Sequence, residues 1–202
     1  MAITPEQVEA AAARWGLSEV VEGVSDGLAT YGSLLLHWNT RLSLTAIRDE
    51  AELIERHLME GVFAAAHHPA ASTVLDFGSG TGIPGIPIGL CRGDVHVTLA
   101  ESQHKKASFL QEVIRTVQPV ASVYAGRAET LPPGSIDAVW MRAVDKSALM
   151  LPVAAALVAP GGSLCLLGTA VPPLLPPVGS WAWKTIPLPR SKDRVLHIGT
   201  RK

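Results

Sequence analysis

The chain has 202 residues, 48% of them apolar, and a formal net charge of −1. This length and composition predict one globular domain with a full core and exclude a disordered chain. The balanced charge carries no polyanion-binding signature for the chain as a whole. The only strongly apolar region, 148–178, is interrupted by prolines and glycines, so we expect no helix long enough to span a membrane.

The first residues, 1–6, contain neither a basic n-region nor an apolar h-region, so we expect no signal peptide. Cys91 and Cys165 are far apart and lack metal-ligand spacing, which argues against a disulfide framework and a zinc site. We therefore predict a reduced, cytoplasmic protein.

Three helices are predicted before the first strand. Thr4 begins a capping-box pattern with a proline at the first helical position. Apolar residues at helical intervals predict a second helix over about 25–38, and Asp49 begins a third. We expect residues 1–70 to form a helical N-terminal extension that packs on a core made by residues 71–202, within a single domain overall.

A glycine-rich turn follows the first predicted strand, 73–75. Asp76 ends the strand, and Gly78, Gly80 and Gly82 alternate after it. This spacing differs from the dinucleotide fingerprint G-x-G-x-x-G. An acidic residue just before the glycines favours S-adenosylmethionine (SAM), because a carboxylate attracts its sulfonium or ammonium group. A turn without a ligand is the alternative, which the conformational cost of three alternating glycines disfavours.

Strands and helices alternate after the glycine turn. Helices are predicted over about 105–116 and 146–158, the second ending at a Pro-Gly-Gly stop signal. This order predicts an α/β fold, a doubly wound, mostly parallel, seven-stranded sheet with helices on both faces. Ligands of such sheets bind beyond the carboxyl ends of the strands. The six further strands are expected at 95–100, 121–124, 136–141, 163–167, 181–186 and 195–200.

Charged residues fall at these strand ends. Glu101 follows the second strand, 21 residues after Gly80, where an acidic residue accepts hydrogen bonds from ribose hydroxyls; a surface carboxylate is the alternative. Arg127 and Glu129 follow the third strand, where an adenine ring would lie; solvated side chains are the alternative. Arg142 follows the fourth strand, where it suits an anionic or carbonyl-bearing methyl acceptor; an ordinary ion pair is the alternative.

The loop after the fourth strand limits the chemistry. It lacks the Asp/Asn-Pro-Pro-aromatic motif for transfer to an exocyclic amine, and it contains no cysteine for covalent attack. His57, on the apolar side of the third helix, is expected to be a core residue rather than a base. The segment 183–202 has six basic residues and one acidic residue, and forms either a solvated chain end or a phosphate-contacting edge.

Several short segments, which follow one another over roughly residues 34–162, match one family pattern when they are taken together. They are Trp38-Asn39, Leu44–Asp49, Arg56-His57-Leu58, Asp76–Pro87, Ser102, Lys105-Lys106, Phe109-Leu110, Gly126–Glu129 and Arg142-Ala143. Together they resemble the glucose-inhibited division protein B family, the bacterial 16S ribosomal RNA guanine-N7 methyltransferases. The Gly-Ile-Pro-Gly-Ile-Pro extension of the glycine turn is the most specific part, with the upstream Leu-Thr-Ala-Ile-Arg-Asp. The chain departs from the family at Ser43, Glu101 and Gly168, where asparagine, aspartate and lysine are usual.

The resemblance implies a class I SAM-dependent methyltransferase fold, with SAM as donor and S-adenosyl-L-homocysteine as product. It implies as acceptor a guanine in the decoding-centre (530) loop, in 16S ribosomal RNA or the small subunit. We expect the protein to be a monomer. Carried onto this sequence, Arg142 is the catalytic residue, the RNA-binding residues are Lys105, Lys106, Arg127 and Arg194, and no metal is expected. The cofactor-binding residues are Asp76, Gly78, Ser79, Gly80, Gly82, Pro84, Gly85, Glu101, Ser102, Arg127, Ala128, Glu129 and Arg142.

Guanine N7 has a free lone pair and no proton, so methyl transfer needs no general base, and proximity and orientation supply the catalysis. We hypothesise that Arg142 orients the guanine through O6. Three alternatives stay open at this point. They are a SAM methyltransferase acting on another RNA, a protein or a small molecule; an NAD-dependent oxidoreductase; and a nucleotide-binding module without catalysis.

Overall fold

The computed structural model describes residues 2–71, 73–142, 148–169 and 180–202. Its helices are α1 (Pro5–Trp15), α2 (Ser18–Val21), α3 (Ser25–Leu42), α4 (Glu50–Leu53), α5 (Met59–Ala66), α6 (Gly85–Cys91), α7 (His104–Val117) and α8 (Leu151–Leu157). A π-helical turn, Ile54–Leu58, joins α4 to α5, and 3-10 helices cover Ala128–Thr130 and Ala148–Met150. The strands are β1 (Thr73–Phe77), β2 (His96–Ala100), β3 (Ala121–Tyr124), β4 (Ile136–Arg142), β5 (Val158–Thr169), β6 (Trp181–Pro187) and β7 (Arg194–Arg201).

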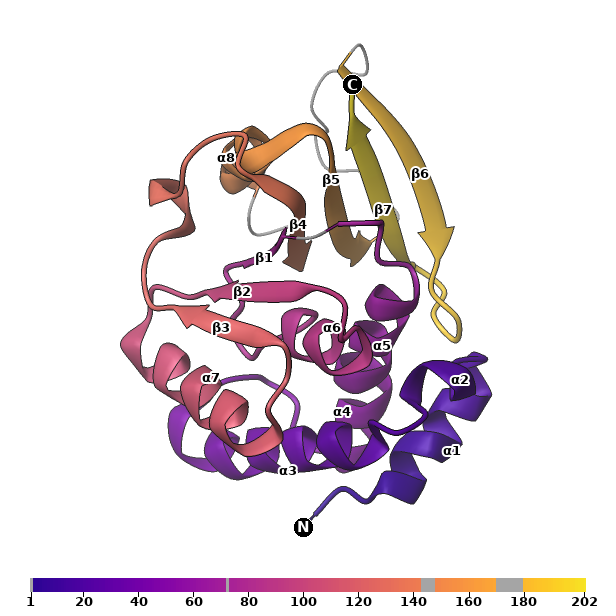
Figure 1. Cartoon of the computed structure of the whole chain (residues 1–202). Coiled ribbons are helices and arrows are strands. Elements are labelled where there is room, and N and C mark those ends of the chain that lie inside the picture. The colour runs from indigo at the N-terminus through magenta and orange to yellow at the C-terminus, as the bar shows by residue number, and fades with distance from the viewer. Residues whose placement is uncertain (1, 72, 143–147, 170–179) are drawn as a thin grey trace.

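The strands form one seven-stranded sheet in the order β3-β2-β1-β4-β5-β7-β6 (Figure 1). The first five pair in parallel, and β7 lies antiparallel between β5 and β6. The predicted mostly parallel, doubly wound sheet is therefore confirmed. Strand order reverses between β1 and β4, so the turn after β1 lies at the topological switch point, where ligands of such sheets bind.

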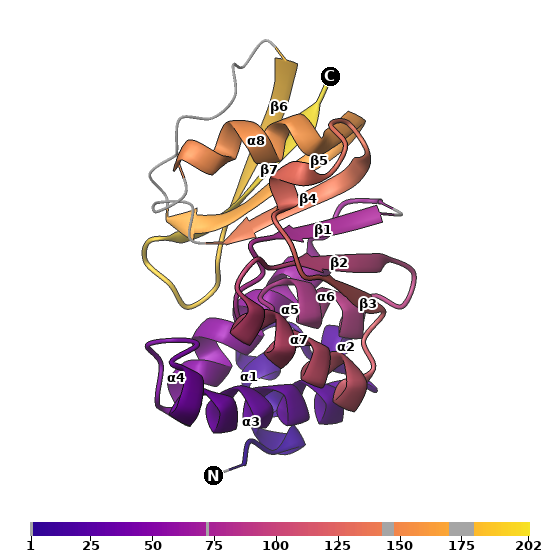
Figure 2. The same ribbon diagram turned by 90° about the vertical axis from the view of Figure 1, so that its left-hand side faces the viewer.

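Both faces of the central strands are buried. Val74 of β1 and Trp140 of β4 belong to a large hydrophobic cluster shared with α1, α3, α5, α6 and α7. Their neighbours Leu75 and Val139 point to the opposite face and pack against α8. Figure 2 shows α8 on the other side of the sheet from the N-terminal helices. The period-two alternation of the strands thus creates two cores.

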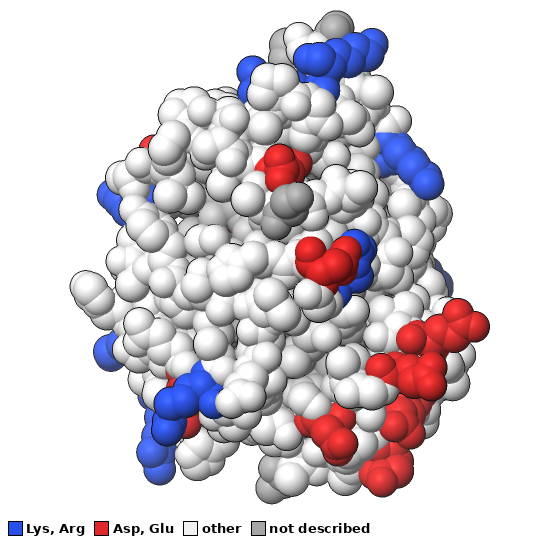
Figure 3. Space-filling model, viewed as in Figure 1, with Lys and Arg blue, Asp and Glu red and all other residues white. Residues whose placement is uncertain are grey.

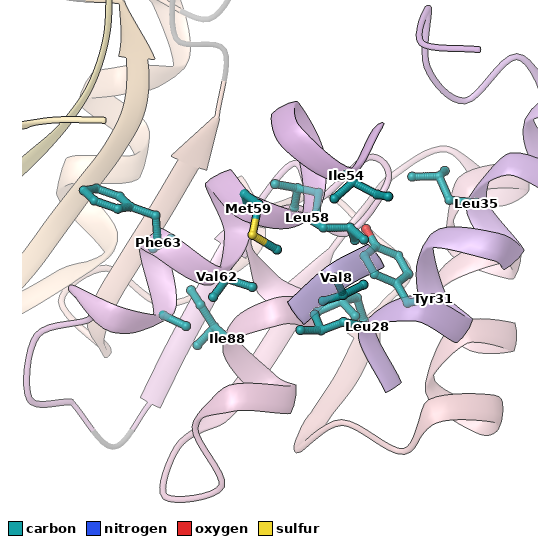
Figure 4. Close-up of a cluster of buried hydrophobic side chains, with 14 of the residues drawn as sticks. Val8, Leu28, Tyr31, Leu35, Ile54, Leu58, Met59, Val62, Phe63 and Ile88 are labelled. Carbon is teal, nitrogen blue, oxygen red and sulfur yellow. The ribbon is translucent and has the colours of Figure 1, made fainter. Parts of the chain in front are cut away.

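The N-terminal helices share the larger core with the sheet. Figure 4 shows Val8 of α1 and Tyr31 of α3 in this cluster, beside side chains of the π-helical turn and α5. Thr4 caps α1 through the predicted capping box, and Asp49 Oδ1 accepts a hydrogen bond from Glu52 N at 2.8 Å. Both predicted helix starts are therefore confirmed.

The helix predicted over about 146–158 ends within one residue of its expected end, but the strand predicted at 163–167 begins earlier than expected. α8 ends at Leu157, and Val158 already pairs with Ile136 of β4 as the first residue of β5. The register then shifts, and the Pro-Gly-Gly sequence forms an irregularity inside β5, where Gly161 takes a φ of 77°. Strand pairing therefore outweighs the local helix signal here. Residues 146–147, at the expected start of this helix, lie outside the described residues.

Candidate functional site

The glycine turn presents bare backbone to an open side. Gly78, Gly80 and Gly82 all take positive φ, of 69°, 58° and 93°, a region that side chains disfavour. A Cβ at Gly78 would meet no atom within 4 Å, whereas a Cβ at Gly82 would lie 2.7 Å from Ile86 Cγ1. The open space at Gly78 fits a cofactor that approaches the main chain at the switch point, whereas Gly82 is required by packing against the chain's own side chains.

Asp76 lies beneath the turn and connects it to α6. Its side chain is 1% exposed, and Oδ2 accepts a hydrogen bond from Gly85 N at 3.2 Å. Burial raises the pKa of Asp76 from 3.8 to about 7. Pro84 immediately precedes α6, and its carbonyl accepts from Ile88 N at 3.0 Å. The predicted attraction of this carboxylate to a cationic group of SAM stays a prediction.

Glu101 connects the end of β2 to the same turn. Its Oε2 accepts from Gly80 N at 3.0 Å, and Oε1 accepts from Gln103 N at 2.8 Å. Ser79 N donates to Ala100 O at 2.9 Å, so the turn is held at two points by this strand end. Ser102, next to Glu101, is exposed. The structure therefore places Glu101 against the glycine turn, and its predicted contact with ribose hydroxyls stays a prediction.

The loop after β3 and the start of α7 lie at the same sheet edge. Ala128 is buried, whereas the Arg127 side chain is 75% exposed and forms an ion pair with Glu129 at 3.3 Å. Lys105 and Lys106 occupy the first turn of α7, and Lys105 is exposed. Their predicted contacts with adenine and RNA stay predictions.

Arg142 makes its contacts with the N-terminal helices. Its Nη2 donates to Glu60 Oε2 and to the Arg56 carbonyl, both at 3.1 Å. Nη2 also lies 3.4 Å from His57 Nδ1, which must accept because arginine has no acceptor. Arg194 of β7 donates to both oxygens of Glu60, at 3.0 and 2.8 Å. The ion-pair alternative for Arg142 is thus present in the structure, and its contact with the acceptor stays a prediction.

His57 is buried in the π-helical turn, as expected of a core histidine. Burial, followed by the charge of Arg142, lowers the pKa of His57 to about 3. The imidazole is therefore neutral near pH 7 and is no strong base.

The basic segment 183–202 is neither simply a solvated chain end nor simply a phosphate-contacting edge, the two alternatives predicted from its charge. Its three arginines all contact other parts of the chain: Arg194 pairs with Glu60, Arg190 Nε lies 3.6 Å from Glu55, and Arg201 Nη1 donates to Val158 O at 2.6 Å. Gly168, the departure from the usual lysine, pairs with Val195 inside β5.

A cavity of about 580 Å³ adjoins the Glu60 cluster. It lies between the N-terminal helices, the end of β5 at Thr169 and the turn from β6 to β7. Arg194 and Glu60 lie in its wall, and so does Arg56. The cavity therefore opens at the carboxyl edge of the sheet, next to the strand that carries Arg142.

Sequence reasoning missed two residues of this edge. Tyr31 of α3 is fully buried and donates from its hydroxyl to Thr81 O in the glycine turn at 2.6 Å. Glu60 of α5, with its side chain 4% exposed, joins the two arginines. The one available signal was a polar group inside an apolar run: Tyr31 on the buried face of a helix, and Glu60 within Met-Glu-Gly-Val-Phe.

Two classes of site receive no support. Among the residues that the structure describes, no group of three or more His, Cys, Asp or Glu side chains could hold a metal ion. Within the same ranges, no helix is long and apolar enough to cross a membrane.

Comparisons with known proteins agree on one family. A family model described as GidB, rRNA small subunit methyltransferase G, matches residues 25–171. The ribosomal RNA small subunit methyltransferase G of Xanthomonas euvesicatoria pv. vesicatoria is 40% identical over 147 residues, 72% of this chain and 69% of the relative. That of Neisseria meningitidis serogroup A is 38% identical over 158 residues, 78% of this chain and 76% of the relative.

Solved structures with low sequence identity share the fold. A SAM-dependent methyltransferase from Aquifex aeolicus superposes with a TM-score of 0.59 at 13% identity, covering 79% of this chain and 97% of that one. The magnesium protoporphyrin IX methyltransferase from Synechocystis, solved with bound SAM, gives 0.61 at 12% identity, covering 85% and 97%. The predicted class I SAM-dependent methyltransferase fold is therefore confirmed.

Proposed function

The chain belongs to the GidB family of rRNA small subunit methyltransferases G, and from this premise we propose that it methylates N7 of a guanine in the decoding-centre (530) loop of bacterial 16S ribosomal RNA. The observation that carries the proposal is the family match over residues 25–171. The open glycine turn at the switch point supports it independently. Membership of a methyltransferase family decides against the NAD-dependent oxidoreductase.

The residues around the glycine turn fit SAM. Gly78 and Gly80 leave space for the cofactor at the backbone, and Asp76 and Glu101 place two buried carboxylates against the same turn. Glu101 would accept hydrogen bonds from the ribose, and the backbone around Ala128 would border the adenine. SAM, when bound, supplies a methyl group on a sulfonium and leaves as S-adenosyl-L-homocysteine.

The chain needs to orient the acceptor rather than deprotonate it. Guanine N7 has an in-plane lone pair and no proton, so the neutral, buried His57 is not required as a base. Proximity and orientation can lower the barrier by several kcal/mol, and by as much as about 7–11 in the best cases. Arg142, at the end of β4, is the residue that we place beside the acceptor nucleotide.

We place the protein in the cytoplasm as a monomer, with the small ribosomal subunit or its 16S RNA as partner. Exposed Lys105 and Arg127, together with Lys106, would contact RNA phosphates on the approach to the site.

In vitro methylation tests the proposal directly. Unmodified small subunits, naked 16S RNA and large subunits are incubated with labelled SAM, and the modified base and atom are mapped. We expect label at one guanine N7 in the small subunit or its RNA, and none in large subunits. Label on large subunits, or at another atom, would contradict the proposal. No label anywhere would favour the nucleotide-binding module.

Gly80→Val tests the cofactor site separately. A side chain at a φ of 58° strains the turn and enters the open space, so SAM binding measured by calorimetry should be lost. Gly93→Val is the matched control, because a Cβ there meets no atom within 4 Å and its φ is not positive. Equal SAM affinity in both variants would rule out this turn as the site.

Arg142→Ala tests the acceptor side. We expect a lower methylation rate at saturating RNA, because the substitution removes a side chain that we place beside the acceptor nucleotide. Steady-state kinetics with 16S RNA measure this. An unchanged rate would remove Arg142 from the site.

A further inference from the structure

One buried carboxylate holds two arginines from different strands. Arg142 ends β4 and Arg194 begins β7, and both ion pairs meet at Glu60 Oε2, at 3.1 and 2.8 Å. The three side chains are 21%, 17% and 4% exposed. Glu60 therefore fixes two guanidinium groups as one unit, although the strands that carry them are not neighbours in the sheet.

This unit has a net positive charge. Two guanidinium groups share one carboxylate, and His57 beside them is neutral, so the group carries +1. The neighbouring charges have other partners: Glu55 pairs with Arg14 at 2.7 Å, and Arg56 with Glu52 at 2.9 Å. The remaining acidic residue of the cavity wall, Asp193, is exposed to water, which screens its charge.

Each of the two arginines, Arg142 and Arg194, has hydrogen-bond donors that its contacts with Glu60 do not use. In the part of the chain that the structure describes, Arg142 bonds through Nε and Nη2, and Arg194 also bonds through Nε and Nη2. Nη1 of each makes no hydrogen bond there. Neither Nη1 is among the fully buried side-chain nitrogens that lack a partner, so each can donate to an anionic oxygen that arrives from solvent. Arg194 and Glu60 line the cavity of about 580 Å³, which offers such an anion a way in.

We infer that Arg142 and Arg194, positioned by Glu60, form one site for a single phosphate group of the acceptor RNA. This inference rests on the proposed function, since it is the RNA that supplies the phosphate. Guanidinium groups recognise phosphate oxygens through paired donors, and one phosphate neutralises the excess charge of the unit. It moves the contact of Arg142 from the O6 atom, expected from sequence, to the backbone beside the target nucleotide.

The salt dependence of RNA binding tests this inference without any methylation. Each phosphate contact contributes about 0.7 to 0.9 to the slope of log affinity against log salt concentration. Arg142→Gln and Arg194→Gln each leave one balanced arginine–Glu60 pair, so each should lower the slope for a 16S RNA transcript by one contact. The double variant should lower it no further than either single variant.

Arg92→Gln is the matched control. Arg92 also pairs with one carboxylate, Asp94 at 2.7 Å, but it precedes β2 at the amino edge of the sheet. For the Arg92→Gln variant, the slope of log RNA affinity against log salt concentration should equal that of the wild type. If the two reductions in slope add in the double variant, the arginines contact two separate phosphates. If the slopes of the arginine variants equal that of the wild type, the arginines contact the base instead. Either result overturns the inference.

Glu60 variants test the positioning role. Glu60→Gln frees both guanidinium charges, so that each arginine can pair with a phosphate of its own; the slope should then become steeper by about one contact, and the Arg substitutions should become additive. Glu60→Asp keeps the charge and should restore the wild-type slope. A purely structural role would lower affinity without steepening the slope, which would contradict the inference. Melting curves identify any variant that does not fold, and the arginine variants then decide the inference alone.

The two proposals fail in different ways. If the wild type binds the transcript with the expected slopes but methylates nothing, the proposed function fails and the phosphate site stands. If it methylates guanine N7 while the slopes of the arginine variants stay unchanged, the phosphate site fails and the proposed function stands.

Discussion

At the scale of single residues, two carboxylates shape the cofactor turn. Asp76 accepts from Gly85 N and Glu101 accepts from Gly80 N, so each holds the backbone that would contact SAM. The sequence predicted both residues at the site from their spacing. It did not predict that each would be tied to the turn itself, because that bond depends on how β1, β2 and α6 pack together.

Asp76 should make SAM affinity depend on pH. Its pKa of about 7 means that the carboxyl is mostly protonated at pH 5.5 and ionised at pH 8. Because the ionised form attracts a cation, SAM affinity should rise through this range, by at most about tenfold per pH unit. Asp76→Asn should remove that rise. Calorimetry from pH 5.5 to 8 measures it, and a wild-type affinity that is flat with pH would exclude this role.

The same group predicts the opposite trend for stability. The folded-state pKa of Asp76 is raised above the unfolded value, so its stabilising contribution is complete below about pH 4 and is lost as pH rises through about 7. The free energy of unfolding without SAM should fall over this range by on the order of a few kcal/mol. Urea unfolding of wild type and Asp76→Asn should isolate this loss; identical pH profiles would contradict it.

Tyr31→Phe should loosen the glycine turn. The change removes a buried 2.6 Å hydrogen bond and leaves the Thr81 carbonyl without that donor, at a cost of about 1–3 kcal/mol of stability. SAM affinity should weaken several-fold with it. Tyr124→Phe is the stability control, because its hydroxyl bonds Thr130 at an exposed position. Denaturant unfolding and calorimetry measure both variants, and equal losses of stability would contradict a role of the Tyr31–Thr81 hydrogen bond in holding the turn.

At the scale of elements, local sequence signals predicted where helices begin better than where strand β5 begins. The caps of α1 and α4 are confirmed because their side chains bond backbone amides only three residues away. The start of β5 was predicted too late because β4 already pairs with Val158 across the sheet. The π-helical turn, Ile54–Leu58, had no signal either, and it carries Arg56 and His57 to the Arg142 side chain. Ser43 ends α3 at a φ of 50°, which asparagine tolerates better.

The contact between β1 and α6 allows a test of this element. In Gly85→Ala the new Cβ would collide with Leu99 Cδ2 and lie 2.7 Å from Asp76 Oδ2. We expect a loss of about 1–3 kcal/mol of stability, together with weaker SAM binding. Gly93→Ala, in open space, should change neither. Thermal unfolding and calorimetry provide the comparison, and equal behaviour of the two variants would show that α6 can shift freely.

At the scale of the molecule, charge is unevenly distributed. Figure 3 shows acidic side chains gathered at the lower right, where Figure 1 places α1 and α2. Glu9, Glu19 and Glu22 line one cavity there. The predicted RNA contacts Lys105 and Lys106 lie instead on α7, at the carboxyl edge of the sheet. A polyanion should therefore approach by that edge and avoid the acidic side.

Charge substitutions test this orientation. Glu19→Lys with Glu22→Lys should leave the KM for 16S RNA within about twofold, because charges farther than a Debye length of about 8 Å are screened. Lys105→Ala with Lys106→Ala should raise that KM several-fold and lower its salt dependence. Steady-state methylation at two salt concentrations measures both. A larger effect from the glutamate pair would place the RNA on the other side.

The sequence by itself determined the sheet, the glycine turn and the family. The periodicity of strands and helices and the glycines of the turn are local properties, so they can be predicted from the sequence alone. Tertiary structure alone decided what surrounds the turn and the acceptor edge. Tyr31 meets Thr81 across 50 residues, and Glu60 meets Arg142 and Arg194 across 82 and 134. No local pattern encodes such contacts, because they arise only when helices α3 and α5 pack against the edge of the finished sheet.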